Sequence, residues 1–247
     1  MKKIIKRILL VLFTIVFVFS AANFGFSLYE KVKTEKVNKA FQEQYVTPVI
    51  PELTPDPDET VEKAPISVNF EALIKRNGDI VGWLYCEGTP INYPVVKGAD
   101  NQEYLRKAID GSYLKSGSLF ADYRNGAVGQ DGNYIIYGHN TSGESMFGTL
   151  TKYKKQEYYD AHPVLYFLTP TANYKIELVS GNTIHRHSDF YRPDIDMNTV
   201  LGNYIPNSTF KTELELSGED KYISLSTCVW DFTDARYVII GRITEVE

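Results

Sequence analysis

Cys228 and Arg236 are the residues whose types and spacing best suit chemistry. Residues 222–227 alternate apolar and polar side chains, which is the two-residue period of a half-buried strand. A second run at residues 236–244 is rich in β-branched side chains. The stretch between the runs, residues 229–235, is short enough for a hairpin loop. We therefore expect the strands to pair, with Cys228 ending one and Arg236 beginning the other. A thiol beside a permanently charged guanidinium is a candidate reactive site.

A histidine stands at a similar strand end: His139 closes the strand-like run at residues 134–139. A nearby imidazole can stabilise a thiolate and then protonate a leaving amine. A covalent intermediate on the cysteine divides one difficult step into two and lets an amine compete with water. A positioned cation such as Arg236 can stabilise the oxyanion or hold the substrate backbone. The alternative for Cys228 is a structural role, since free cysteine is among the most buried residue types.

The other residues that could bind metal or form a disulfide give weaker signals. Cys86 is the second of two cysteines, and a disulfide is possible in an oxidising compartment. We predict none, because pairing would silence Cys228. His185 and His187 can share one face of a strand, but no third ligand lies at a telling spacing. No metal or other cofactor is expected. The formal charge of −5 disfavours nucleic-acid binding.

The N-terminal residues predict a membrane anchor. Residues 1–7 form a basic tail, and the run at residues 8–29 is uncharged and mostly apolar. About twenty such residues, at a rise of 1.5 Å each, span a hydrocarbon core. The basic flank stays in the cytoplasm. We expect a single-pass protein of the cell membrane, with its N-terminus cytoplasmic and its folded domain outside. The competing interpretation is a cleaved signal peptide, because residues 20–22 are small.

Beyond the anchor, the sequence divides into a spacer and one folded domain. Residues 30–65 are expected to form an extracytoplasmic stalk. Its first part, residues 31–44, is polar and can be helical, and the prolines between residues 48 and 57 indicate an extended, semi-rigid linker. Residues 66–247 are expected to form the catalytic domain.

The domain reads as mainly β, with many strands and few helices, which predicts a β-barrel or a sandwich. Strands are expected at residues 81–86, 91–96, 118–121, 134–139, 164–168, 174–179, 222–227 and 237–243. Short helices are expected at residues 67–77, capped by Ser67, and at 102–108, 146–153 and 197–204. The region from residue 181 to residue 220 is long and rich in turn formers, and a connection of that length is more often a binding loop than filler.

Several motifs, taken in order, carry a resemblance to a known family. They are Tyr137-Gly138-His139-Asn140, Leu225-Ser226-Thr227-Cys228, and Arg236 at the start of the last strand. With them the chain resembles a sortase, a membrane-anchored cysteine transpeptidase of Gram-positive bacteria. The resemblance is closest to class B sortases, on the sequences at residues 69–74, 81–83, 91–96 and 145–150. It covers residues 68–243, which is essentially the whole outer domain.

The resemblance implies an eight-stranded sortase barrel and a cut-and-join reaction. Cys228 would attack the peptide bond after threonine in a C-terminal sorting signal of a secreted protein, with His139 and Arg236 as the other catalytic residues. An amine of peptidoglycan, or of its lipid-linked precursor, would then resolve the acyl-enzyme and anchor the protein to the cell wall. Ser226, Thr227 and Asn92 are the expected substrate-binding positions.

Two other classes of protein remain open at this point. A cell-wall cysteine peptidase would share the cysteine and the histidine, and would hydrolyse rather than transfer. That fold usually places its cysteine at the start of a helix, and the alternating run before Cys228 argues against it. A surface-binding module on a stalk would have no reason to combine Cys228, His139 and Arg236 at strand ends.

Overall fold

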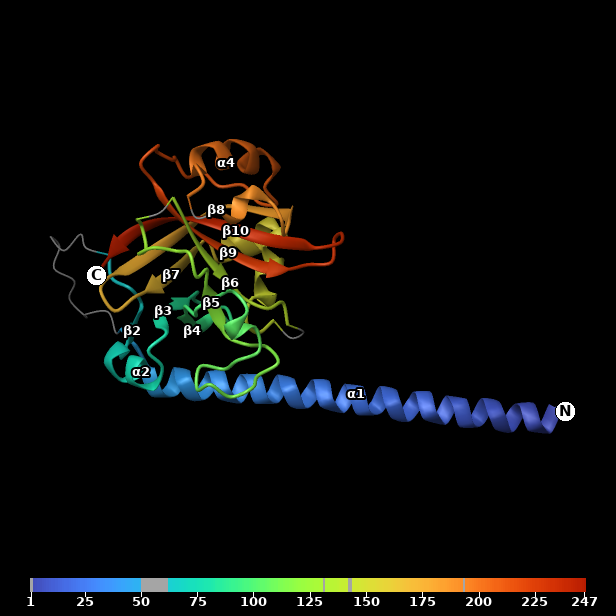
Figure 1. Cartoon of the computed structure of the whole chain (residues 1–247). Helices are drawn as coiled ribbons and strands as arrows, with labels where there is room; N and C mark the ends of the chain where they lie inside the picture. Colours follow the sequence, from blue (N-terminus) through green and yellow to red (C-terminus); the bar gives the residue numbers. More distant parts are fainter. Residues whose placement is uncertain (1, 50–61, 131, 142–143, 193) are drawn as a thin grey trace.

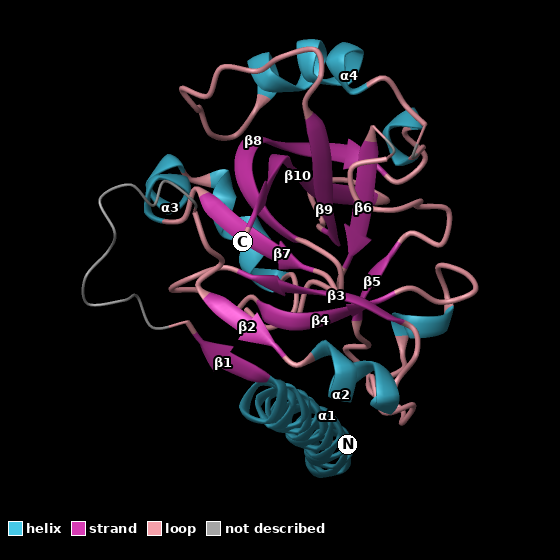
Figure 2. Cartoon of the chain, turned by 90° about the vertical axis from the view of Figure 1, so that its left-hand side faces the viewer, coloured by secondary structure: helices cyan, strands magenta, loops and turns pink. Residues whose placement is uncertain are grey.

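Eight strands close into a barrel, in the order β10-β8-β7-β3-β4-β5-β6-β9, as Figure 2 shows. The computed structural model describes residues 2–49, 62–130, 132–141, 144–192 and 194–247. The strands are β3 (Ile80–Tyr85), β4 (Asn92–Val96), β5 (Leu119–Ala121), β6 (Asn133–Tyr137), β7 (Val164–Leu168), β8 (Asn173–His185), β9 (Lys221–Cys228) and β10 (Ala235–Val246). The expectation of a barrel is confirmed, and each expected strand is present.

The pairing of β6 with β9 determines which strand ends lie together at the rim of the barrel. These strands run parallel, with Tyr137 opposite Ser226, so their carboxyl ends meet at one rim. The backbone continues the ladder there, since the Gly138 N–H donates to the Ser226 carbonyl at 3.1 Å. Strand β10 lies antiparallel to β9 on its other edge. The rim therefore receives the end of β6, the end of β9 and the start of β10.

One helix dominates the N-terminal part of the chain. Helix α1 (Lys2–Tyr45) is the helix among the described residues that is long and apolar enough to cross a membrane. Its last turns run along the barrel, and its N-terminal part projects away from it (Figure 1). Where α1 meets the barrel, the Thr34 and Ser116 hydroxyls lie 2.9 Å apart, and Gln42 donates to the Asn92 carbonyl at 2.7 Å.

The expected stalk at residues 30–65 differs from the structure in its first part. The helix expected at residues 31–44 is present as the end of α1, but it packs against the barrel. Phe41 and Tyr45 join an apolar cluster with residues of the domain. Strand β1 (Val46–Pro48) then pairs with β2 (Ile66–Val68). Buried aromatic side chains hold this segment in place. The linker prolines after Pro48 lie at residues 50–61, outside the described residues.

Three local expectations need correction. Helix α2 (Phe70–Arg76) is capped by Asn69, whose side chain accepts from the Ala72 N–H at 3.0 Å, because Ser67 is engaged in β2. The connection expected from residue 181 begins later, since β8 continues to His185, and the helix expected at residues 197–204 is present within it as α4 (Met197–Tyr204). Two expected helices are 3-10 helices, η1 (Glu103–Leu105) and η2 (Gly148–Lys154). The remaining short helices are α3 (Gln156–Ala161), η3 (Asp189–Tyr191) and η4 (Ile205–Asn207).

Candidate active site

The hairpin formed by β9 and β10 brings the cysteine beside the arginine. Cys228 is the last residue of β9, and its direct partner across the ladder is Arg236. The loop closes when the Val229 N–H donates to the Ala235 carbonyl at 3.2 Å. Both Cys228 and Arg236 are half-buried, so each side chain is held by its strand yet accessible. The pairing predicted from the alternating pattern is confirmed.

Two side-chain hydrogen bonds fasten His139 to the same rim. The Thr227 hydroxyl donates to the Gly138 carbonyl at 2.8 Å, and the Asn140 amide donates to the Cys228 carbonyl at 2.8 Å. They clamp the residues before and after His139 onto the end of β9. As a result, His139, Cys228 and Arg236 line one pocket, of about 350 Å³.

The contacts of His139 define which ring nitrogen can accept a proton. Its Nε2 lies 2.9 Å from the Leu105 carbonyl oxygen. Because a carbonyl oxygen only accepts, Nε2 carries the hydrogen and Nδ1 of the neutral ring has a free lone pair. Burial and the nearby charge of Arg106 hold the pKa of His139 below its usual range, although the bond to Leu105 opposes them. The ring is therefore neutral near pH 7 and can serve as a base.

The guanidinium of Arg236 keeps most of its donors available. Its Nη1 donates to the adjacent Ala235 carbonyl at 2.9 Å, and it makes no ion pair with a carboxylate of the described residues. Arg242, further along β10, differs in this respect. Its Nη2 binds Glu177 at 2.6 Å and its Nη1 binds the Glu215 carbonyl at 2.9 Å. Arg236 can therefore donate hydrogen bonds to a ligand in the pocket.

A buried carboxylate organises the far wall of the pocket. Asp122 is fully buried, and its oxygens accept hydrogen bonds from Arg124 at 2.7 and 2.8 Å, from Tyr137 at 2.9 Å and from Asn101 at 3.0 Å. Burial alone would raise the pKa of Asp122, but these donors outweigh it and hold the pKa below its usual range. Asn101, Arg124 and Tyr137 all line the pocket, so Asp122 fixes the positions of three lining side chains.

The expected substrate-binding residues separate into two groups. Ser226 and Thr227 line the pocket. Ser226 shares a hydrogen bond of 2.9 Å with the Tyr191 hydroxyl, whereas the Thr227 hydroxyl is used by the clamp described above. Asn92 is not among the residues that line it. Its side-chain oxygen accepts from the Trp83 indole at 2.6 Å, so its expected contact with substrate finds no support in the geometry and stays a prediction.

Sequence reasoning missed several residues that line the pocket. They are Asn101, Leu105, Arg124, Tyr191 and Arg186. Asn101 and Leu105 lie at a short 3-10 helix, and no local pattern marks such a position. Tyr191 lies in the long connection after β8, in a short 3-10 helix that no local pattern predicted. The sequence signal at Asn101 and Leu105 is a polar residue followed closely by an apolar one. This pattern is too common to predict a pocket.

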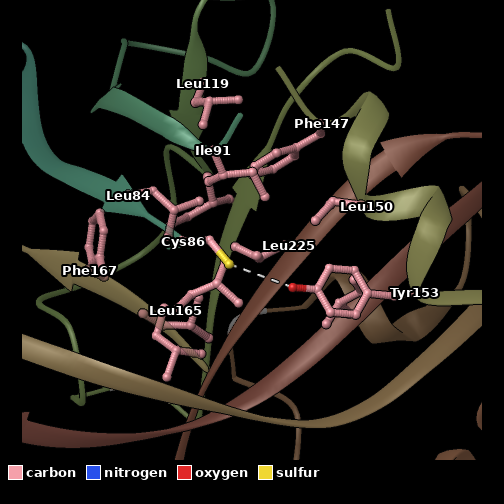
Figure 3. Close-up of a cluster of buried hydrophobic side chains, with 14 of the residues drawn as sticks. Leu84, Cys86, Ile91, Leu119, Phe147, Leu150, Tyr153, Leu165, Phe167 and Leu225 are labelled. Carbon is pink, nitrogen blue, oxygen red and sulfur yellow. Dashed lines mark hydrogen bonds between the residues drawn. The ribbon is translucent and has the colours of Figure 1, made fainter. Parts of the chain in front are cut away.

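The second cysteine lies in a different environment, inside the barrel. Cys86 is buried among apolar side chains, with its sulfur 3.7 Å from the Tyr153 hydroxyl and 3.5 Å from the Val164 carbonyl (Figure 3). Burial raises the pKa of its thiol. Both cysteines are free. His185 and His187 lie side by side, with ring centroids 5.3 Å apart, but no group of three metal-binding side chains occurs among the described residues.

Comparison with known proteins gives a consistent result. Residues 84–244 match the family model described as the sortase domain. Sortase B of Listeria monocytogenes is 31% identical over 236 residues, which are 92% of this chain and 92% of the relative. The Staphylococcus aureus sortase B–substrate complex has a TM-score of 0.68 at 31% identity, and the match covers 72% of this chain and 85% of that one. A sortase B complexed with triglycine has a TM-score of 0.67 at 30% identity, over 72% and 86% of the two chains.

Proposed function

We propose, since this chain belongs to the sortase family and within it to class B, that Cys228, His139 and Arg236 are its catalytic residues. Sortases are cysteine transpeptidases that attach proteins to the cell wall, and this chain is such an enzyme. The observation that carries the assignment is the shared pocket. A half-exposed thiol, a neutral imidazole and a guanidinium without a carboxylate partner among the described residues line it together.

The proposed reaction has two halves. In the first, the Cys228 sulfur attacks the carbonyl carbon of the peptide bond after threonine in a sorting signal. His139 takes the thiol proton of Cys228, the C–N bond breaks, His139 passes that proton to the leaving amine, and a thioester remains on Cys228. In the second, an acceptor amine attacks the thioester carbon, a new amide forms, and the thiol is released. Arg236 offers N–H donors to the oxygen on which negative charge develops in both halves.

The proposed substrates are a secreted protein with a C-terminal sorting signal and an amine of peptidoglycan or of its lipid-linked precursor. The related complexes support this pair: one sortase B is described as bound to substrate and another to triglycine, a peptide with a free amine. The pocket suits an extended peptide, because Tyr191, Ser226 and Arg236 offer polar contacts along it. Ser226 and Thr227 are the proposed substrate-binding residues at the rim.

The proposed location is the cell membrane. The apolar part of α1 supports a single-pass anchor, and the basic residues before it support a cytoplasmic N-terminus. The catalytic domain then faces outward, where sorting signals emerge from the membrane. Protease protection of the domain in intact cells tests the orientation, and a domain resistant to external protease until the cells are lysed would contradict it.

One experiment separates transfer from the alternative of hydrolysis. The protein is incubated with a library of sorting-signal peptides and an added amine, and the products are identified by mass spectrometry. Peptide joined to the amine supports the proposed function, whereas cleaved peptide without joining supports a cysteine peptidase. No turnover of any peptide would contradict both. The Cys228→Ala variant is the matched control, since it lacks the proposed nucleophile.

A further inference from the structure

A second pocket lies between α1 and the barrel, and it meets the first at His139. This helix-side pocket, of about 300 Å³, is lined from α1 by Ser27, Glu30 and Lys31 and from the barrel by Arg106, Lys115 and His139, among others. Of the described residues, His139 alone lines both pockets. The catalytic imidazole therefore separates the space beside Cys228 from a space formed against the N-terminal helix, which Figure 1 shows running along the barrel.

Glu30 is the unusual residue of the helix-side pocket. Its side chain is buried, with the residue only 8% exposed, and its Oε2 has no hydrogen-bond partner among the described residues. A buried carboxylate oxygen without a donor is costly, and such a group in a native fold calls for an explanation. Because the residue lines the helix-side pocket, a turn of its carboxylate toward the pocket would let an N–H group of a ligand supply the missing partner.

The cations near Glu30 do not supply that partner. Lys31 pairs with Glu35 at 3.8 Å, and Arg106 donates to the Lys115 carbonyl. No ion pair joins Glu30 to a described lysine or arginine within 4.0 Å. The pocket thus offers an acceptor unpaired among the described residues, in the same cavity as the imidazole, and its lining includes Lys31, Arg106 and Lys115. That combination suits a ligand with an amine at one end and acidic groups elsewhere.

We propose that the helix-side pocket binds the acceptor amine of the second half-reaction, with Glu30 accepting one of its N–H groups. This inference rests on the proposed function. The amine nitrogen attacks the thioester carbon, so that a C–N bond forms and the C–S bond breaks. The proton lost by the amine passes to His139 and then to the Cys228 sulfur, which leaves as the free thiol. The donor peptide and the acceptor would thus approach the same imidazole from separate pockets.

The position of Glu30 suits an acceptor that comes from the membrane. It is the first residue after the uncharged run at residues 8–29, and Ser27 at the end of that run also lines the helix-side pocket, so the pocket lies where the proposed anchor leaves the lipid. Lipid-linked precursor and mature peptidoglycan both carry the amine and the acidic groups required. Adding each of them in turn, as precursor in vesicles and as purified wall fragments, distinguishes the two sources by the rate of joining.

The test measures how efficiently each of several acceptors reacts with the acyl-enzyme. A sorting peptide is added with triglycine, with a lysine peptide bearing a free ε-amine, or with hydroxylamine, which reacts with thioesters without needing a binding site. In Glu30→Gln, we expect the apparent KM of the peptide amine to rise about tenfold, the scale of one charged hydrogen bond. Acyl-enzyme formation and capture by hydroxylamine should stay unchanged, which also shows that the variant is folded. Glu43→Gln is the control, since Glu43 lies on α1 outside the helix-side pocket and is exposed.

The outcomes separate the two proposals. Failure to form any acyl-enzyme in the parent protein would contradict the proposed function. Normal acyl-enzyme with an unchanged KM in Glu30→Gln would overturn only the acceptor site. Equal rises in Glu30→Gln and Glu43→Gln would also overturn only the acceptor site, because the effect would then come from the charge of α1 in general. A parent protein that reacts with hydroxylamine and joins neither peptide amine would contradict both proposals, because its acyl-enzyme would not transfer to a peptide amine.

Discussion

The barrel interior around Cys86 and the barrel rim around Cys228 place the same side chain in opposite settings. In the interior, the sulfur is enclosed by apolar side chains and burial raises the pKa of the thiol. At the rim, the residue is half-exposed, ends a strand and faces an arginine across the ladder. The residue type alone therefore does not decide reactivity. Access, and the charges and bases next to the thiol, decide it.

The two regions also differ in what holds them together. The interior is packed by large side chains such as Phe147, Phe167 and Tyr153, so we expect changes there to alter stability first. The rim is fixed by backbone pairing and by the hydrogen bonds of Thr227 and Asn140. The side chains proposed to be catalytic contribute little packing there, so changes at the rim should alter kinetics first. Substitutions in each region test this difference.

The largest effect is expected at the two cysteines. Cys228→Ala should abolish both peptide cleavage and acyl-enzyme formation while leaving the thermal transition nearly unchanged. Cys86→Ala should keep its activity and lose about 1 kcal/mol of stability, the usual size for a small buried change. Peptide turnover and thermal unfolding are measured on both variants. Lost activity in Cys86→Ala with a normal transition would reverse the assignment of the two thiols.

A large effect is also expected at His139. His139→Ala should lower turnover by about 10²–10⁴-fold, the usual contribution of positioned proton transfer. Steady-state kinetics with one sorting peptide provide the measurement, and circular dichroism checks that the variant is folded. A loss smaller than about tenfold would mean that another group carries the proton.

A somewhat smaller effect is expected at Arg236, with Arg242 on the same strand as its matched control. Arg236→Ala should lower kcat by about 10²–10³-fold, the scale for removing one oxyanion donor. Arg236→Lys should retain part of the activity, because lysine keeps the charge but loses the planar fork. Arg242→Ala should leave kcat unchanged, since Arg242 is bound to Glu177. A greater loss at Arg242 than at Arg236 would remove Arg236 from the site.

The smallest effect concerns stability at acidic pH. The folded state disfavours protonation of His139, because burial and Arg106 lower its pKa. Below about pH 6.5, the unfolded chain binds a proton at this residue more readily than the folded one. Stability contributed by His139 is therefore present at neutral pH and is lost as the pH falls. Thermal unfolding of the parent and of His139→Asn at several pH values should show a weaker pH dependence in the variant. An equal pH dependence of unfolding in the parent and the variant would show that folding does not lower the pKa of His139.

How much of the fold and the site the sequence could predict depends on the range of each interaction. The pairing of Cys228 with Arg236 follows from a local alternation and a short loop, and it was predicted correctly. The parallel pairing of β6 with β9 joins distant segments, so the position of His139 rested on the family resemblance. Asn92 shows where prediction from the sequence fails. Its hydrogen bond to Trp83 joins two neighbouring strands, and the spacing of residues along the chain does not reveal it. The cap of α2 at Asn69 was missed because Ser67 is also a suitable capping residue. In the structure, Ser67 pairs in β2 instead.

Helix α1 continues from the apolar run into the barrel contacts as one helix. Between Glu30 and Tyr45 it rises by about 22 Å, at 1.5 Å per residue. If the apolar run is embedded in lipid, the catalytic rim cannot swing freely on a tether. Because Glu30 and His139 line one pocket, the rim is held at one height close to the bilayer surface, and only sorting signals that emerge at that height can reach it. The polar length between a client's own anchor and its sorting signal then becomes a criterion of selection, independent of the motif itself.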